Sequence, residues 1–148
     1  MKRPDFMAQA FAEAEAAAER GEVPIGAVIV RGTDIVARAG NRTRELNDAT
    51  AHAEILAIRE ASTKLGQERL TGLDLYVTLE PCTMCAAAIA FARLRRLYFG
   101  AADDKGGAVV SGVRFYASPT CHHAPDVYAG IGETRAAEIL KGFFKDRR

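Results

Sequence analysis

The sequence predicts an α/β fold, in the form of a three-layer α/β/α sandwich around a mixed five-stranded central sheet. Segments with helical periodicity alternate along the chain with short segments rich in β-branched residues. Two early strand-like segments share a turn-rich link, as in an antiparallel hairpin, and two later ones flank a helix, as in a parallel β-α-β unit. A sheet that contains both arrangements is mixed.

The first half of the chain is expected to hold two helices and the hairpin. Gly21 closes an apolar helical stripe made of Phe6, Met7, Ala10, Phe11, Ala14 and Ala18. Residues 23–30 and 35–39 form the hairpin, joined by the turn-rich residues 31–34. The second helix begins at His52 and ends near Gly66, a residue type that often ends helices.

The second half is expected to supply the β-α-β unit. Residues 73–79 form a strand that leads directly into a helix beginning near Pro81, and residues 95–100 form the next strand. The glycine-rich segment 101–125 fits no single element. Residues 127–131 fit an edge strand, and a final helix is expected from about residue 134 to residue 145.

One imidazole, two thiols and one carboxylate have the spacing of a catalytic zinc site. Cys82 and Cys85 lie three apart at a predicted helix start, so both can reach one ion, and the positive helix end favours their thiolate form. His52 and Glu54 are two apart, which inside a helix would turn them about 200° from each other. They are therefore expected at a second helix start, where His52 is still entering the helix.

These residue types predict hydrolytic chemistry. His52, Cys82 and Cys85 supply three ligands for Zn²⁺ and leave a fourth position for water, as in catalytic rather than structural zinc sites. Glu54 is then free to move protons between that water and a substrate. The combination of H-x-E with P-C-x-x-C resembles the signature of the zinc-dependent nucleobase deaminases.

Other interpretations of the cysteines remain open. Cys82 and Cys85 alone also fit a redox pair, and a structural zinc would need a fourth protein ligand. Three adjacent residues, Cys121, His122 and His123, are candidates for that ligand or for a second metal site. Adjacent residues rarely bind one ion together, so we expect them to be loop residues near the substrate.

Composition places the chain among ordinary globular proteins. Its 148 residues, 49% hydrophobic and 26% charged, fit one domain that spans residues 1–148. Three cysteines provide no disulfide framework, and no apolar run approaches the ~20 residues that cross a membrane. The N-terminus lacks the pattern of a secretory signal. We therefore expect a cytoplasmic protein without a membrane segment.

The formal net charge of +1 argues against nucleic-acid binding by bulk electrostatics. Charge is nevertheless uneven, because the last fourteen residues carry five basic and two acidic side chains, and Arg93, Arg95 and Arg96 form a second basic group. As an alternative to nucleic-acid binding, the first group can be the solvated C-terminal end of a helix, where cations are favourable. Phe143 and Phe144 beside these cations favour a surface that binds unstacked bases, although burial is the commoner fate of a phenylalanine.

Several segments together resemble the bacterial tRNA adenosine deaminases, which have the cytidine deaminase fold. The zinc motif is shared by all enzymes of that fold, so it indicates deamination but not the substrate. The flanking segments make the resemblance specific to the tRNA adenosine deaminases. These are residues 22–28, 40–42, 50–55, 76–85 and 99–101, with Asp103, Lys105 and the tail 143–148.

The resemblance implies conversion of adenosine to inosine at the wobble position of a tRNA, chiefly an arginine tRNA, by a homodimer with one Zn²⁺ per subunit. It assigns zinc binding to His52, Cys82 and Cys85 and proton transfer to Glu54. It further implies that Asn41 binds the flipped base, that Ile25, Leu79 and the Ala53 backbone line its pocket, and that four residues contact the anticodon stem-loop: Asp103, His123, Phe144 and Arg147.

Asn41 and Asp103 also fit ordinary turn residues. Two other functions remain as alternatives. The first is a deaminase of a free base or nucleoside, such as guanine, cytosine or cytidine, on the same fold. The second is a noncatalytic zinc or redox module.

Overall fold

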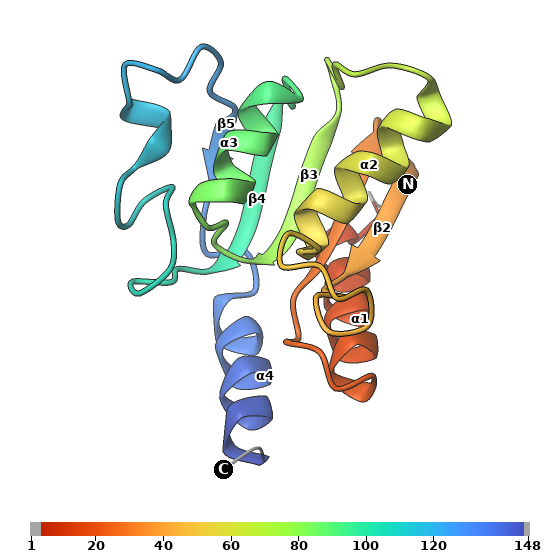
Figure 1. Ribbon diagram of the computed structural model, residues 1–148, viewed down its shortest axis with the longest axis vertical. Coiled ribbons are helices and arrows are strands. Elements are labelled where there is room, and N and C mark those ends of the chain that lie inside the picture. The colour runs from red at the N-terminus through yellow and green to blue at the C-terminus, as the bar shows by residue number, and fades with distance from the viewer. Residues whose placement is uncertain (1–3, 147–148) are drawn as a thin grey trace.

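A mixed five-stranded sheet separates two layers of helices in the computed structural model, which describes residues 4–146 (Figure 1). The strand order is β2-β1-β3-β4-β5, with β1 antiparallel to both β2 and β3, and β3, β4 and β5 parallel. The strands are β1 (Gly26–Arg31), β2 (Asp34–Gly40), β3 (Asp74–Leu79), β4 (Arg96–Ala101) and β5 (Asp126–Tyr128). The predicted mixed sheet, hairpin and β-α-β unit are confirmed.

The alternation of side chains along the strands supplies an apolar surface to each helical layer. Ala27, Ile29 and Val77 point to the face that α2 (Ala53–Leu65) and α3 (Thr83–Phe91) cover. Val28 and Val30 point to the opposite face, where α1 (Phe6–Glu19) and α4 (Glu133–Asp146) pack. A short 3₁₀ turn, Phe115–Ala117, lies in the long loop between β4 and β5.

Small residues bring α1 close to the sheet. A Cβ atom on Gly26 would lie 2.0 Å from the Ala10 carbonyl oxygen and 2.5 Å from the Ala14 nitrogen, so only glycine fits between β1 and α1. Ala10 and Ala14 are fully buried there. The alanine-rich stripe therefore allows a short distance between helix and sheet, as its composition predicts.

Two strand boundaries differ from the prediction by more than one residue. β1 begins at Gly26 rather than at residue 23, because Pro24 has no N–H to donate to a neighbouring strand and the Ile25 N–H bonds the Val23 carbonyl instead. β5 covers residues 126–128 rather than 127–131, because Gly130 and Gly132 adopt positive φ angles of 77° and 75° that end the extended conformation.

Candidate active site

The three predicted metal ligands meet at the end of the sheet where β3 leads into α3. His52 is the N-cap of α2, Cys82 is the N-cap of α3, and Cys85 lies in the first turn of α3. Both caps have extended backbone, with ψ of 155° and 176°, so their side chains are not committed to a helix face. Two helix N-termini therefore converge on one point, as the spacing predicts.

The geometry of this group fits a zinc ion. His52 Nδ1 lies 3.6 Å from Cys82 Sγ and 3.5 Å from Cys85 Sγ. A tetrahedral ion with ordinary Zn–N and Zn–S distances separates its nitrogen and sulfur ligands by about 3.5 Å. Among residues 4–146 this is the one such ligand group, and it has no fourth protein member. A zinc ion held there would keep one position open.

Electrostatics prepare the thiols for a cation. A hydrogen bond from Cys85, aided by His52, lowers the pKa of Cys82 to about 4, although burial acts in the opposite direction. The hydrogen bond to Cys82 and burial both raise the pKa of Cys85. The positive ends of α2 and α3 also favour negative charge at this point. The low pKa of Cys82 and the positive ends of the two helices therefore favour negative charge at this point, which suits a cation.

Glu54 lies beside this group and is almost fully buried, with 4% of its surface exposed. Burial raises its pKa to about 7, and the negative charge of Cys82 contributes in the same direction. A carboxyl whose pKa lies close to neutral pH can both accept and donate a proton under working conditions. Its placement and its pKa suit a proton-transfer group.

Asn41 joins the end of β2 to the start of α2. Its side-chain oxygen accepts a hydrogen bond of 2.8 Å from the Ala53 N–H, and both residues are buried. The side chain of Asn41 is therefore a long-range cap of α2, rather than part of the local turn that a residue of this type also fits. Since the oxygen of Asn41 is engaged, its amide NH₂ is the end that can donate to a ligand.

Four of the predicted substrate residues line one hollow of about 400 Å³ at the end of β3 that leads to Cys82: Ile25, Leu79, Asp103 and Phe144. Its lining residues include none of the metal ligands and neither Glu54, Asn41 nor Ala53. The four substrate residues come from three separate parts of the chain and from α4, the helix that extends away from the sheet in Figure 1. Phe144 is 51% exposed and also borders a neighbouring hollow with Thr43 and Arg44.

Comparisons with known proteins match the whole chain to one family. The MafB19-like deaminase family model covers residues 1–148. The tRNA-specific adenosine deaminase of Agrobacterium fabrum is 67% identical over 147 residues, which is 99% of this chain and 97% of that protein. The chain belongs to the family of tRNA-specific adenosine deaminases. The predicted family is thereby confirmed, and with it an enzyme that hydrolyses C–N bonds.

Other relatives agree with this assignment. The Bacillus subtilis tRNA-specific adenosine deaminase is 43% identical, with 97% of this chain and 89% of that protein covered. A solved structure from studies of A-to-I editing by tRNA deaminases at the wobble position has a TM-score of 0.90 at 70% identity, covering 91% of this chain and 98% of its own. These neighbours have the cytidine deaminase fold, which confirms the predicted fold type.

A guanine deaminase from Bacillus subtilis shares part of this likeness. Its TM-score is 0.66 at 39% identity, and the match covers 69% of this chain and 66% of that one. The tRNA-specific relatives, in contrast, match over nearly the full length of both chains.

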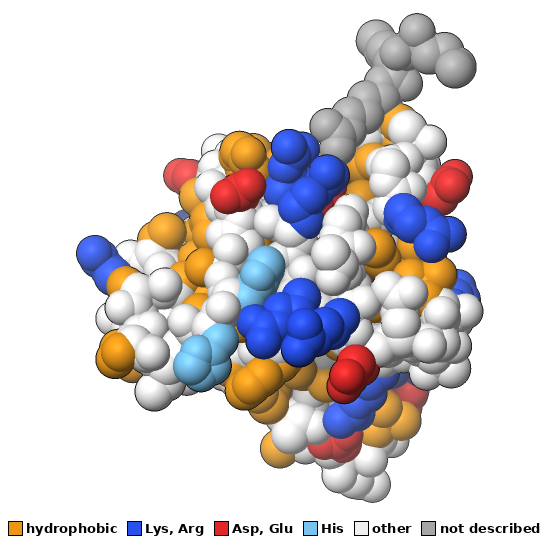
Figure 2. Space-filling model, turned by 90° about the horizontal axis from the view of Figure 1, so that it is seen from above, with side chains coloured by type: hydrophobic (Ala, Val, Ile, Leu, Met, Phe, Trp, Pro, Cys, Tyr) orange, Lys and Arg blue, Asp and Glu red, His pale blue; other side chains and the backbone are white. Residues whose placement is uncertain are grey.

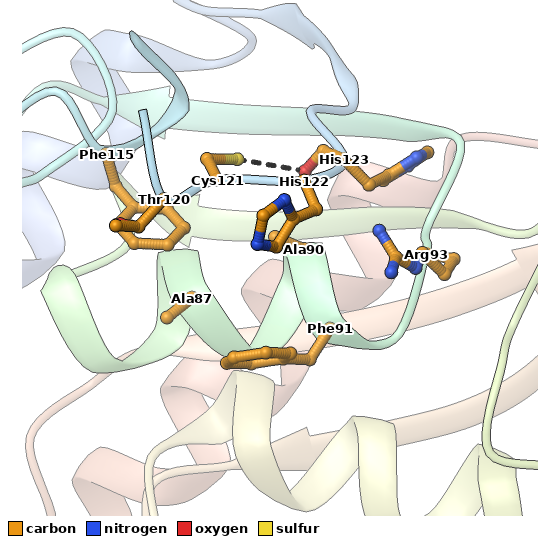
Figure 3. A pocket seen from close by; sticks show the side chains of 9 residues that line it. All are labelled: Ala87, Ala90, Phe91, Arg93, Phe115, Thr120, Cys121, His122 and His123. Carbon is orange, nitrogen blue, oxygen red and sulfur yellow. Dashed lines mark hydrogen bonds between the residues drawn. The ribbon is translucent and has the colours of Figure 1, made fainter. Parts of the chain in front are cut away.

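His123 of the deaminase lies apart from the other predicted substrate residues. Its ring Nε2 is 2.8 Å from the Leu94 carbonyl oxygen, and its own carbonyl accepts a bond from the Cys121 thiol. It lines a second, smaller hollow with His122 and Arg93, which shares no residue with the hollow that contains Asp103 (Figure 3). Arg147 lies outside the described residues.

The second basic group of the deaminase is also remote from the metal ligands. Arg96 begins β4, and β4 is parallel to β3, whose opposite end leads to Cys82. Figure 2 looks onto this far end, where Lys and Arg side chains gather beside histidines. Arg95 is already paired with the buried Asp74 at 2.8 Å. The group therefore does not line the candidate substrate hollow.

Two buried carboxylates organise the loops around the site, and sequence reasoning missed both. Glu22 accepts the N–H groups of Arg44 and Glu45 in the loop that leads to α2. Glu80 accepts four backbone N–H groups from residues 103–111. Their partners lie more than twenty positions away in irregular segments, so no periodic pattern marks them. The available signal was a Glu beside each of two predicted strands: Glu22 directly before residues 23–30 and Glu80 directly after residues 73–79.

No helix among residues 4–146 is both long and apolar enough to span a bilayer.

Proposed function

We propose that this deaminase converts adenosine to inosine at the wobble position of a tRNA, chiefly an arginine tRNA, in the cytoplasm. The observation that carries the proposal is the convergence of His52, Cys82 and Cys85 on one point with the carboxyl of Glu54 beside it. The names of the relatives and the full-length match to them indicate the substrate.

We assign one zinc ion per subunit to His52 Nδ1 and the two thiolates of Cys82 and Cys85. When bound, zinc would supply a Lewis acid that makes a water molecule more acidic. Two thiolates offset the charge of Zn²⁺, which makes that effect weaker than in an all-histidine site and increases the need for a nearby base. Glu54 is the carboxylate placed to act as that base.

Glu54 moves the protons of the reaction. Its carboxylate oxygen takes a proton from water and delivers it to a ring nitrogen of adenine, while the water oxygen adds to the carbon that bears the amino group. Glu54 then takes the remaining proton from the added hydroxyl group and delivers it to the amino nitrogen, so that the C=O bond forms as the C–N bond breaks and ammonia leaves. Burial raises the pKa of Glu54 above that of an ordinary carboxyl, which helps the side chain to hold a proton between the two transfers.

The base is held by Asn41 and by apolar contacts. The amide NH₂ of Asn41 donates to a ring nitrogen of the base, because its oxygen is committed to the Ala53 N–H. Ile25 and Leu79 flank the ring as walls of the hollow. Ala53, fully buried at the start of α2, places its backbone beside the base.

The neighbouring nucleotides of an anticodon loop contact the rest of the hollow. Deaminating enzymes need an unstacked base, and a loop presents one at low cost. We assign contacts with the flanking nucleotides to Asp103 and Phe144 in this hollow, to His123 in the second hollow, and to Arg147. The exposed ring of Phe144 offers a stacking surface, which suits a single-stranded segment.

We also propose a homodimer. The ring of Phe91 is 75% exposed at the end of α3, and with Ile55 and Ile58 of α2 it borders a hollow of about 370 Å³. An exposed apolar surface of this kind is typical of a protein interface. In a symmetric dimer, a second copy of the chain would cover this apolar surface with the same surface of its own.

The substrate test compares a transcribed arginine tRNA with free adenosine, cytidine and guanine under identical conditions. The proposal predicts inosine at the wobble position and negligible turnover of the free compounds. Turnover of a free base with the tRNA unchanged would establish the alternative, to which the partial likeness to guanine deaminase points.

A further inference from the structure

Glu80 is a buried carboxylate that has no role in the proposed reaction. Only 2% of its surface is exposed. It follows Leu79, which lines the substrate hollow, and precedes Cys82 by two positions. An ionised group in this position needs several hydrogen bonds to balance the loss of water.

The two oxygens of Glu80 bind one loop in different ways. Oε2 accepts the backbone N–H groups of Val109, Val110 and Ser111 at 2.9, 2.9 and 3.0 Å. Oε1 accepts the N–H of Asp103 at 2.9 Å and the Ser111 hydroxyl at 2.9 Å. The carboxylate therefore holds both ends of the loop that runs from Asp103 to Ser111.

The loop is also pressed against Glu80 at its middle. A Cβ atom on Gly107 would lie 2.4 Å from the Cδ atom of Glu80, closer than any side chain permits. The next residue, Ala108, donates its N–H to the Pro81 carbonyl at 2.9 Å. The loop thus contacts the segment just before Cys82 through both side chain and backbone.

We propose that Glu80 is a positioning residue, which holds Asp103 at the edge of the substrate hollow in a fixed relation to the metal ligands. The inference rests on the proposed function, because it takes Asp103 as a contact for RNA. Glu80 itself touches no substrate. Its backbone leads to Cys82 and its side chain holds Asp103, so one residue links the reaction centre to the surface that receives the flanking nucleotide.

The different bonding of the two oxygens gives a selective variant. In Glu80→Gln the amide oxygen can take the place of Oε2 and keep its three N–H donors. The amide NH₂ then occupies the place of Oε1, where the Ser111 hydroxyl can turn to accept from it, but the Asp103 N–H loses its acceptor. This substitution releases Asp103 and leaves the other end of the loop attached.

The experiment measures KM and kcat of the zinc-loaded, full-length enzyme on an anticodon stem-loop RNA. Gly107→Ala is the second variant, since it pushes the loop away from an intact Glu80. Asp74→Asn is the matched control, because Asp74 is equally buried and charged but lies at the opposite end of β3, bound to Arg95. Metal analysis accompanies each variant.

Glu80→Gln and Gly107→Ala are expected to raise KM roughly tenfold, as small displacements of positioning groups do, with kcat within about twofold of wild type and zinc retained. Asp74→Asn should lower stability and leave KM unchanged. Unchanged KM in a folded Glu80→Gln or Gly107→Ala variant overturns the inference, as does an equal rise in Asp74→Asn. If the wild type forms no inosine, the proposed function fails instead.

Discussion

Asn41 is expected to serve two purposes through the two ends of its amide, and two substitutions separate them. Its oxygen accepts a hydrogen bond from the Ala53 N–H, 2.8 Å away, at the start of α2, and we propose that its NH₂ donates to the base. Asn41→Ala removes both groups. Asn41→Asp keeps an acceptor for the Ala53 N–H and removes the donor.

The magnitudes follow from the burial of this contact. Asn41 is 5% exposed and Ala53 is fully buried, so Asn41→Ala leaves a backbone N–H without a partner or nearby water. Such a loss costs about 1–3 kcal/mol of unfolding free energy. A carboxylate near the N-terminus of a helix is favourable, so Asn41→Asp should stay within about 1 kcal/mol of wild type. Loss of the bond to the base should lower kcat/KM by about 5- to 150-fold in both variants.

Urea unfolding and steady-state deamination of an anticodon stem-loop measure the two effects independently. The account predicts that the variants differ in stability and agree in loss of activity. Wild-type kcat/KM in Asn41→Asp would refute the base contact, and equal destabilisation in both variants would refute the capping role of the side-chain oxygen.

Four further outcomes are expected. Hydrogen bonds from Glu45 and Arg44 hold the pKa of Glu22 below its usual 4.5 despite burial, so Glu22 stabilises the fold above about pH 4.5 and loses this effect as pH falls further. The difference in unfolding free energy between wild type and Glu22→Gln should therefore shrink below that pH, and a constant difference would contradict the argument. If the proposed dimer forms through Phe91, Phe91→Glu should convert it to a monomer in light-scattering measurements, whereas an unchanged mass rejects the proposed interface. Phe144→Ala should weaken stem-loop binding by about 5- to 100-fold, as loss of one stacking contact does, and unchanged affinity contradicts the contact. Chelation of zinc should abolish deamination and added Zn²⁺ should restore it, while full activity without metal excludes the zinc assignment.

The reaction centre could be predicted from the sequence because its members lie close together in two short motifs. The spacing of His52 and Glu54 required a helix start, and the strand before Pro81 predicted that Cys82 and Cys85 would open another helix. The residue preferences of helix N-termini are sufficient to predict the backbone conformation of both motifs. That the two motifs lie close together in space depends on the sheet. The predicted parallel β-α-β unit indicated this too, because it places the metal ligands at the strand ends.

The loops around the centre could not be predicted, because long-range hydrogen bonds shape them. Segment 101–125 shows no periodicity, and its first part is organised by Glu80, a residue from a different element. The place of His123 in this loop predicts a contact with the substrate, but it does not indicate that the ring Nε2 of His123 lies 2.8 Å from the Leu94 carbonyl oxygen. The helix or strand propensity of a residue does not indicate which distant backbone group its side chain will hydrogen-bond.

Inosine formation by a Glu54→Gln variant, measured together with its zinc content, tests whether Glu54 transfers the protons of the reaction. The substitution keeps the size of the side chain and removes its ability to transfer protons. The account predicts a zinc content near one per subunit and a fall in kcat of at least about 10²-fold, the usual contribution of a positioned acid–base group. A zinc-loaded Glu54→Gln variant with wild-type kcat would contradict it.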